Sequence, residues 1–318
     1  MPELPEVTTT VAGLQRVLPG ITITDVWTDL AKENQSYKQF LNTIKDATFY
    51  KKFKKQTIGA KVKKVERRAK NILIHLSPRP GLGQEAQTIL IHMKMTGHII
   101  YGKYVYNKKE NKWSPDKDER EALHDPYNRF VHVVFELSNG KHFVFCDSRK
   151  FGKVTLLPTI DIHESIHLAG TGPEPLDDDF SFEKFKSCIT KKKNQKIKTV
   201  LMDPYTIAGI GNIYSDEMLW MSGIHPETKP EDIPDKKLRE LYKDMRDVLN
   251  KGIDFGGDSM SDYRDIDGKR GEFQNHHNVY RRIKQKCGKK NCSGVIIRKS
   301  VGARNAHFCP IHQKLYEK

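Results

Sequence analysis

The spacing of apolar residues changes near the middle of the chain, and this change restricts the fold more than any other feature. Before residue 170, short apolar and β-branched runs alternate with turn residues, as in strands. After residue 179, apolar residues recur every three or four positions, as in helices. The passage 170–179 between them is rich in Pro, Gly and Asp and predicts a linker. We therefore predict an α+β multidomain chain in which a strand-rich block precedes a helical one.

The strand-rich block opens with a helix, predicted over residues 6–18 because Val7, Val11, Leu14 and Leu18 share one helical face. Pro5 suits its first turn. Strands are predicted at 23–26, 71–76, 88–92, 98–101, 130–137 and 142–145. Ser138-Asn139-Gly140 predicts a tight hairpin between the last two. The pattern indicates a β-sandwich or barrel from about 21 to 157, with the polar residues 102–127 as an inserted surface loop.

The helical block contains two clear amphipathic segments. Ser181 is placed to cap a helix that carries Phe182, Phe185 and Ile189. A longer helix follows Asp235, with apolar residues at 238, 241, 245, 248 and 249. Residues 254–278 are rich in Gly, Asp, Ser and Asn and poor in apolar residues, so a mobile loop is expected there.

The charge balance favours a polyanionic partner. The 318 residues include 55 Lys and Arg against 40 Asp and Glu, a net charge of +15, and 37% are hydrophobic, which excludes global disorder. Two tracts, 45–70 and 276–318, are strongly basic. No apolar run approaches about 18 residues and the N-terminus lacks the pattern of a signal peptide, so we predict a soluble, non-secreted protein. A merely basic, solvated surface explains the charge equally well.

Three of the five cysteines lie in the last tenth of the chain and predict a metal site. Cys287, Cys292, Cys309 and His312 form two pairs separated by 16 residues, a spacing that suits a β-hairpin zinc finger. Four protein ligands leave no open position, so the predicted single Zn²⁺ is structural. His307 is an alternative fourth ligand, and chance clustering in a basic tail is the alternative to a metal site. Cys146 and Cys188 are expected to be buried thiols.

The N-terminus combines reactive groups in an unusual way, in the sequence Met1-Pro2-Glu3-Leu4-Pro5-Glu6. Removal of Met1 exposes the secondary amine of Pro2 beside the carboxylates of Glu3 and Glu6. An α-amino group has a reference pKa of about 8 against roughly 10.4 for Lys, so far more of it than of a lysine is neutral and nucleophilic near pH 7. Attack on a sugar C1′ gives an iminium that acidifies the C2′ hydrogen and permits elimination. The alternative is an ordinary chain start with Pro at a helix entry.

Several motifs occur together in the order of one family. They are Met-Pro-Glu-Leu-Pro-Glu-Val at 1–7, Arg-Arg-Ala-Lys at 67–70, His-Met-Lys-Met-Thr-Gly at 92–97, Asp-Ser-Arg-Lys-Phe-Gly at 147–152, Gly-Pro-Glu-Pro-Leu at 172–176, Gly-Ile-Gly-Asn-Ile-Tyr at 209–214, Gly-Ile-His-Pro at 223–226 and the terminal finger. From end to end, the chain resembles formamidopyrimidine-DNA glycosylase. The resemblance implies an N-terminal β-sandwich with helices (1–160), a helix-two-turn-helix domain (161–278) and a zinc finger (279–318).

The resemblance also implies roles for individual residues. Pro2 is the nucleophile and Glu3 the acid/base partner that protonates the sugar O4′, with Glu6 as a supporting carboxylate. The family's residues that bind the phosphates on either side of the lesion correspond here to Lys70, His92, Asn212 and Arg304. A solvated strand face is the alternative explanation of Lys70 and His92.

Met95, Arg149 and Phe151 match the family's void-filling trio. An enzyme that acts on C1′ of a stacked nucleotide must first extrude it, at a cost of a few kcal/mol. Met and Phe can fill the gap while Arg149 bonds the orphaned base. Phe151 could otherwise be a core residue. Residues 256–275 match the family's segment that closes over the flipped base.

Three departures from the family pattern stand out. His312 occupies the usual position of a fourth Cys, and four residues instead of two separate the first cysteine pair, so we expect a finger of altered shape. Arg304 keeps its spacing of five residues before Cys309. The insertion 102–127, with Trp113 and Tyr127, has no family role.

The resemblance implies a bifunctional glycosylase and abasic-site lyase that removes oxidised purines, such as 8-oxoguanine and formamidopyrimidines, from duplex DNA by β,δ-elimination. It implies a monomer in the bacterial cytoplasm, associated with the nucleoid, with no organic cofactor. One alternative is an endonuclease VIII-like preference for oxidised pyrimidines, although Leu4 favours the purine branch. A non-catalytic DNA-binding zinc-finger protein is the other.

Overall fold

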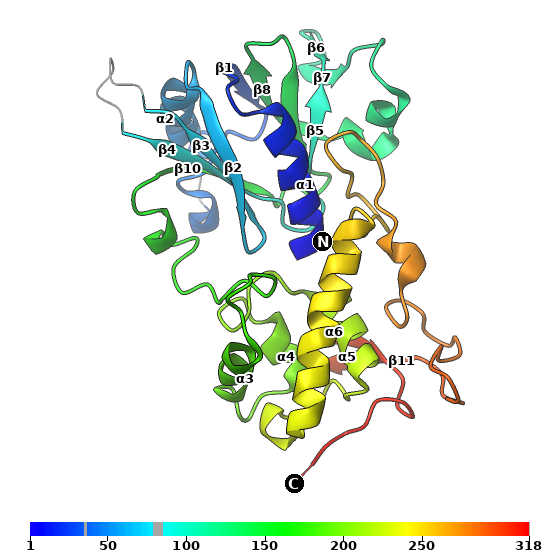
Figure 1. Ribbon diagram of the computed structural model, residues 1–318. Helices are drawn as coiled ribbons and strands as arrows, with labels where there is room; N and C mark the ends of the chain where they lie inside the picture. The colour runs from blue at the N-terminus through cyan, green and yellow to red at the C-terminus, as the bar shows by residue number, and fades with distance from the viewer. Residues whose placement is uncertain (35–36, 79–84, 318) are drawn as a thin grey trace. The chain divides into compact units, whose positions relative to one another are not determined.

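A computed structural model describes residues 1–34, 37–78 and 85–317, which form two compact units (Figure 1). The first unit contains residues 1–169 and 256–272, and the second contains 170–255 and 273–318. No helix among the described residues has the length and hydrophobicity that a membrane crossing requires. The predicted boundaries at 160/161 and 278/279 stay predictions, because compact units follow contacts and not function.

The first unit is a β-sandwich with flanking helices. One sheet has the order β1-β8-β9-β5 and the other β10-β4-β3-β2, with antiparallel pairing throughout. The elements are α1 (Leu4–Val17), α2 (Ala47–Thr57), β1 (Ile23–Thr28), β2 (Val62–Arg68), β3 (Asn71–Leu76), β4 (Gln87–His92), β5 (His98–Gly102), β8 (Val131–Leu137), β9 (His142–Cys146) and β10 (Lys153–Pro158). The six predicted strands and the first helix are confirmed to within about two residues.

The inner faces of the two sheets form one core. Val133 and Phe135 of β8 and Phe143 of β9 contribute to it from one sheet, and Ile72 and Ile89 from the other. The α1 helix, which packs on β2, adds Val7, Val11 and Leu14. Burial of this apolar surface is the main force that holds the sheets together.

The insertion 102–127 is not the simple surface loop that its polarity predicted. It forms a hairpin of β6 (Tyr104–Asn107) and β7 (Lys112–Pro115), followed by short 3₁₀ turns at Glu121–His124 and Pro126–Arg129. Tyr104 and Leu123 are buried in a second core with Val134 and Val144, on the outer face of the sheet. The insertion therefore covers a face that would otherwise expose apolar residues. This explains why β8 and β9 are apolar on both sides.

The second unit is mostly helical, as expected. Its helices are α3 (Phe182–Thr190), α4 (Ile197–Met202), α5 (Asn212–Ser222) and α6 (Asp235–Asp254), and a hairpin of β11 (Ile297–Val301) and β12 (Arg304–Phe308) lies near the C-terminus. Ser181 caps α3 through the N–H of Lys184, as predicted. The five predicted apolar residues of α6, the long yellow helix in Figure 1, are all buried. Cys188 is half-buried on α3, so the prediction of a buried thiol holds only for Cys146.

Residues 256–272 pack within the first unit, although they follow α6 in the chain. Tyr263, Arg264 and Ile266 are all at least nine-tenths buried. Ile266 joins the sandwich core, and its side chain leaves no room for a Cβ at Gly13 of α1. The segment is thus a loop with several buried contacts, and the mobility that its composition predicted stays a prediction.

Candidate functional site

The N-terminus places Pro2 and two carboxylates at the start of α1. Pro2, Glu3 and Glu6 are buried, whereas Met1 is 41% exposed. Glu3 is the N-cap residue, and a reciprocal capping box joins it to Glu6: the N–H of Glu3 donates to Oε2 of Glu6 at 2.6 Å. The positive end of the helix stabilises both carboxylates. The side chains of Glu3 and Glu6 therefore hold each other at the start of α1, directly after Pro2, whose nitrogen becomes an amine when Met1 is removed.

Residues 256–272 complete the surroundings of Glu6. Oε1 of Glu6 accepts the N–H of Asp258 at 2.7 Å, and the Tyr263 hydroxyl donates to the Glu6 carbonyl at 2.9 Å. Gly257 has φ +86°, and a Cβ there would lie 2.8 Å from Cγ of Glu6, so a larger residue would displace the carboxylate. Sequence reasoning missed these contacts, because their partners are some 250 residues apart.

His92 and Lys70 lie at one end of β4 and β3, the two central strands of the second sheet. His92 ends β4, opposite Asn71 of β3 and Lys153 of β10, and Lys70 precedes Asn71. The backbone N–H of Lys94 donates to Nδ1 of His92 at 3.0 Å, which leaves the ring proton on Nε2. Burial and the charges of Lys94, Lys70 and Lys153 lower the pKa of His92 to about 3. His92 is therefore a neutral hydrogen-bond donor among cations, which suits a phosphate oxygen.

Met95, Arg149 and Phe151 lie on two loops that are hydrogen-bonded to each other. Met95 is 39% and Phe151 48% exposed, and the Arg149 guanidinium lies 4.5 Å from the centre of the Phe151 ring. The Thr96 hydroxyl donates to the buried Asp147 carboxylate and accepts the N–H of Arg149 at 3.2 Å. Exposure of large apolar side chains on a fixed loop is typical of a binding surface and not of a core. Phe151 is therefore not a core residue, and its role as a wedge stays a prediction.

Asn212 and Arg304 belong to the second unit. Asn212 is the first residue of α5, after Gly209 (φ +81°) and the N-cap Gly211. Its position puts the backbone N–H groups of a helix start beside an amide side chain, an arrangement that suits an anion. Arg304 is exposed and begins β12, directly after a turn in which Gly302 and Ala303 both have positive φ.

A buried ionic cluster holds the β11–β12 hairpin against α4 and α5. Lys198 and Asp216, 0% and 1% exposed, form an ion pair, and the other Asp216 oxygen accepts the N–H of His307 at 3.0 Å and contacts its Nδ1 at 2.9 Å. Asp216 contacts only Nδ1 of His307, and neither His307 nor His312 belongs to the cysteine cluster among the described residues, so the alternative of His307 as the fourth ligand stays a prediction. Sequence reasoning missed Lys198 and Asp216. A charged residue within an apolar helical pattern indicates a buried, paired charge, and this signal could have found them.

Cys287, Cys292 and Cys309 form a cluster whose ligand atoms lie within 4.8 Å of one another. Each sulfur accepts an N–H: Cys287 from the Trp220 indole at 3.3 Å, Cys292 from Gly294 at 3.3 Å, and Cys309 from His312 at 3.4 Å. Such N–H donors stabilise thiolates, so the donor set fits a soft divalent metal.

His312 does not belong to this cluster among the described residues. Its Nε2 lies 2.7 Å from the Trp220 carbonyl. If Nε2 donates its proton there, Nδ1 keeps a lone pair, the arrangement that usually accompanies a histidine ligand. The fourth coordination position therefore stays a prediction.

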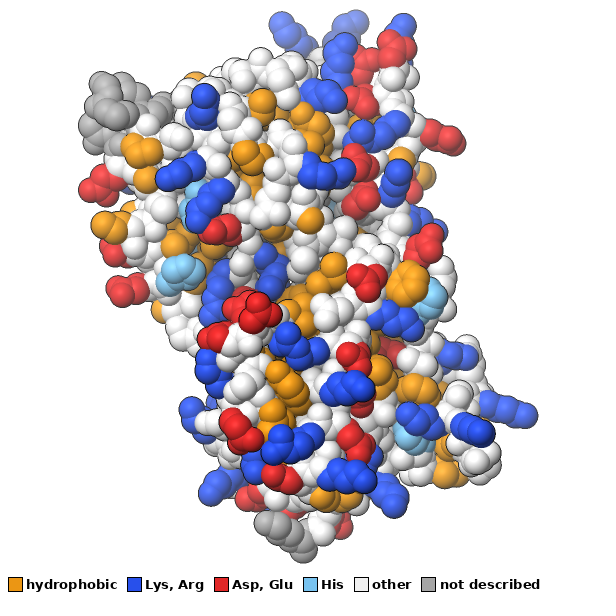
Figure 2. Space-filling model, in the orientation of Figure 1, with side chains coloured by type: hydrophobic (Ala, Val, Ile, Leu, Met, Phe, Trp, Pro, Cys, Tyr) orange, Lys and Arg blue, Asp and Glu red, His pale blue; other side chains and the backbone are white. Residues whose placement is uncertain are grey.

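Lys and Arg side chains are distributed among Asp and Glu over the face drawn in Figure 2. On this face the charge pattern alone does not outline a binding surface, and the assignment depends on the local geometry described above.

Comparison with known proteins agrees with the sequence motifs. The model of the formamidopyrimidine-DNA glycosylase N-terminal domain matches residues 1–154, and that of the formamidopyrimidine-DNA glycosylase H2TH domain matches 171–264. The formamidopyrimidine-DNA glycosylase of Pelotomaculum thermopropionicum is 35% identical and covers 99% of this chain and 100% of its own length. The formamidopyrimidine-DNA glycosylase of Bacillus subtilis is 32% identical and covers 97% of this chain and 98% of its own length.

A solved structure gives the same result for the fold. The Lactococcus lactis Fpg in complex with DNA that contains an abasic site superimposes with a TM-score of 0.77 at 26% identity, covering 98% of this chain and 99% of that one.

Proposed function

Because the chain belongs to the formamidopyrimidine-DNA glycosylase family, which removes oxidised purines from DNA, we propose that Pro2 and Glu3 carry its chemistry. The observation that carries this assignment is the capping box at the start of α1, which fixes the side chains of Glu3 and Glu6, one and four residues after Pro2. A DNA glycosylase with lyase activity, as is typical of the family, needs an amine and a carboxylic acid in this arrangement.

The proposed reaction begins after Met1 is removed. The Pro2 nitrogen forms a bond to C1′ of the damaged nucleotide as the bond from C1′ to the base breaks and the base takes the electron pair. The Glu3 carboxylate takes the proton that the Pro2 nitrogen loses and passes it to O4′. The C1′–O4′ bond breaks with its electron pair on O4′, an iminium joins Pro2 to the sugar, and the expelled base takes a proton from water. Loss of a C2′ proton then expels the 3′ phosphate, and a second elimination expels the 5′ phosphate. Hydrolysis of the iminium regenerates the amine.

The phosphates that flank the lesion are proposed to bind Lys70, His92, Asn212 and Arg304. The neutral Nε2–H of His92, the cations around it and the start of α5 support this assignment. Met95 and Phe151 are proposed to fill the space that the extruded nucleotide leaves, and Arg149 to bond the orphaned base.

The cysteine cluster is proposed to bind one structural Zn²⁺ with His312 as the fourth ligand. Zinc would stabilise the region around the β11–β12 hairpin that carries Arg304, and the reaction needs no metal at C1′. We further propose that the enzyme acts as a monomer on the DNA of a bacterial nucleoid in the cytoplasm.

The assignment is tested with the Met1-processed protein and a duplex that contains 8-oxoguanine opposite cytosine. Sodium borohydride should trap a covalent protein–DNA adduct, and Pro2→Gly should lose most of it while retaining DNA binding. Absence of an adduct with folded, processed wild type would contradict the role of Pro2. A protein that retains Met1 and binds DNA without cleavage would instead support the non-catalytic alternative.

The same assay with a thymine glycol duplex separates purine from pyrimidine preference. The curated relatives carry the formamidopyrimidine name, and we expect faster excision of 8-oxoguanine.

A further inference from the structure

We propose that the ion pair between Arg264 and Asp125 positions residues 256–272 for removal of the damaged base, which gives the insertion 102–127 a role in the reaction. Arg264 belongs to segment 256–272 and Asp125 to the insertion, and both lie in the first unit. The inference rests on the proposed function of Pro2 and Glu3. It concerns positioning residues and not groups that touch the reacting atoms.

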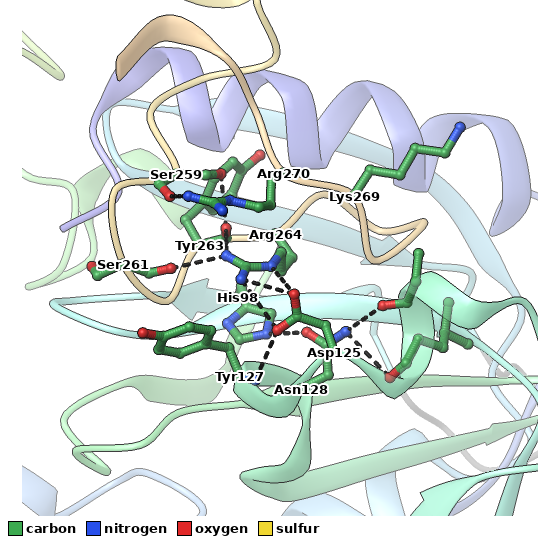
Figure 3. Close-up of polar contacts among 12 residues, drawn as sticks. His98, Asp125, Tyr127, Asn128, Ser259, Ser261, Tyr263, Arg264, Lys269 and Arg270 are labelled. Carbon is green, nitrogen blue, oxygen red and sulfur yellow. Dashed lines mark hydrogen bonds and ion pairs between the residues drawn. The ribbon is translucent and has the colours of Figure 1, made fainter. Parts of the chain in front are cut away.

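All three nitrogens of the Arg264 guanidinium donate hydrogen bonds (Figure 3). Nε and Nη2 donate to both Asp125 oxygens at 2.9 to 3.1 Å, and Nη1 donates to the carbonyls of Ser261 and Tyr263, each at 2.8 Å. The Tyr127 ring lies 4.9 Å from the guanidinium carbon, and Arg264 is only 2% exposed. A buried guanidinium bound in this way fixes the backbone of 261–264, since its release would leave several polar groups unpaired.

Asp125 is itself held in place. Its Oδ1 accepts the N–H of Tyr127 at 2.9 Å and caps the turn Pro126–Arg129. Within that turn, the buried Asn128 bonds the carbonyls of Ala122 and Leu123 and contacts Nε2 of His98 on β5 at 2.9 Å (Figure 3). The insertion thereby connects Arg264 to the sheet.

A second contact reinforces the first. Arg120 of the insertion donates to the carbonyls of Tyr101 and Asp267 at 2.7 and 3.0 Å and pairs with the Asp267 carboxylate at 3.0 Å. Gly268 has φ +80°, and a Cβ there would lie 2.5 Å from the carbonyl oxygen of Ala122. Segment 256–272 therefore lies directly against the insertion at two places along its length.

The other contacts of the segment reach the candidate site. Asp258 and Tyr263 bond Glu6, and Asp262 accepts the hydroxyl of Ser148 at 3.0 Å, next to Arg149. The segment thus joins the N-terminal carboxylates to the loop that carries Arg149. Because the base is bonded to the same C1′ that Pro2 attacks, a damaged base must project close to this segment. Displacement of 261–264 should therefore disturb base removal more than the reaction of a sugar that has lost its base.

The test compares two substrates. Single-turnover excision of 8-oxoguanine and borohydride trapping on a preformed abasic duplex are both measured at saturating protein with wild type, Asp125→Asn and Arg264→Lys. We expect excision to fall on the order of 10- to 100-fold in each variant, as for a displacement near 1 Å, while abasic trapping changes less than about 3-fold. The double variant should lose little more than either single variant, because both remove one interaction.

Arg16→Gln is the matched control. Arg16 forms an exposed ion pair with Asp267 of the same segment, 3.1 Å long, and should leave both rates unchanged. Thermal unfolding of each variant shows whether it is folded. If Arg264→Lys does not fold, Asp125→Asn still tests the ion pair, because it keeps the shape of the side chain. Equal losses on both substrates, or no loss in folded variants, would overturn the inference. Failure of wild type on both substrates would contradict the proposed function instead.

Discussion

The carboxylate of Asp147 accepts the backbone N–H of Gly152 at 2.7 Å and thereby closes the loop that presents Arg149 and Phe151. Its other oxygen accepts the Thr96 hydroxyl and, at 3.3 Å, the N–H of Arg149. Asp147 is fully buried, and a Cβ at Gly152 would lie 2.3 Å from the Phe145 ring. The shape of this loop is therefore set by a buried charge and by a close approach to the sandwich core.

Asp147→Ala should therefore destabilise the fold and disorder this loop. Removal of the carboxylate leaves the buried N–H of Gly152 and the Thr96 hydroxyl without their acceptor, at about 1–3 kcal/mol for each group left unsatisfied. We expect the free energy of unfolding in urea to fall by about 2–4 kcal/mol, and excision of 8-oxoguanine to fall more than non-specific DNA binding. Ser138→Ala, which loses one exposed hydrogen bond from the N–H of Thr22, is the control. A stable variant with normal excision would contradict this account.

The lowered pKa of His92 predicts a pH effect on stability. Burial and three nearby lysines lower its pKa to about 3, whereas an unfolded histidine titrates near 6.5. Above pH 6.5 the residue is neutral in both states and has no effect. As the pH falls from 6.5 towards 3, the unfolded chain binds a proton that the folded chain does not, so His92 destabilises the fold. Urea unfolding of wild type and His92→Gln between pH 7.5 and 4.5 should show the variant losing less stability.

The exposed His124 provides the control for that comparison, since His124→Gln should follow wild type at every pH. A difference between wild type and His92→Gln that does not change with pH would refute the neutral assignment of His92. If His92 stays neutral in the folded protein, its protonation should not increase DNA affinity as the pH falls from 7.5 to 4.5.

Lys45 should affect stability at alkaline pH, whereas His92 acts at acidic pH. Its ammonium is buried, donates to the Lys150 carbonyl at 2.6 Å and lies 4.2 Å from the centre of the Phe40 ring. Burial lowers the pKa to about 8, despite the opposing charge of Asp147. Between pH 8 and about 10.5 the unfolded chain binds more protons than the folded chain, so the contribution of Lys45 to stability rises with pH.

The measurement is the difference in unfolding free energy between wild type and Lys45→Met at pH 7.5, 9 and 10. That difference should move in favour of wild type as the pH rises. Lys51→Met, on the exposed face of α2, should show no such trend. A constant difference for Lys45→Met would mean that the ammonium is not buried in solution.

The sequence predicted those elements whose pattern is local. Residues 71–76 are uniformly apolar apart from Asn71 and His75 and form β3 as predicted. The β2 strand was missed because only Val62 and Val65 are buried among charged residues, and its conformation depends on pairing with β3. Motif resemblance located the candidate site residues, but the Arg264–Asp125 pair joins positions 139 residues apart. No local pattern signals such a contact.

Zinc binding at the cysteine cluster can be tested by a pair of glycine substitutions. A Cβ at Gly294 would lie 2.3 Å from Sγ of Cys309 and 3.2 Å from Sγ of Cys292, so alanine must push the sulfurs apart. At Gly288, next to Cys287, nothing lies within 4 Å of the same added atom. Gly294→Ala should therefore reduce zinc content well below one per chain, and Gly288→Ala should leave it unchanged.

The fourth ligand is tested in the same assay by His312→Ala. If Nδ1 of His312 completes the site, this variant retains zinc only weakly and loses it to a mild chelator, since three thiolates alone leave an open position. DNA affinity should fall in parallel, because the cluster and the Arg304 hairpin belong to the same C-terminal region and metal binding is coupled to its folding. Full zinc occupancy in His312→Ala, resistant to chelation, would show that another group supplies the fourth bond.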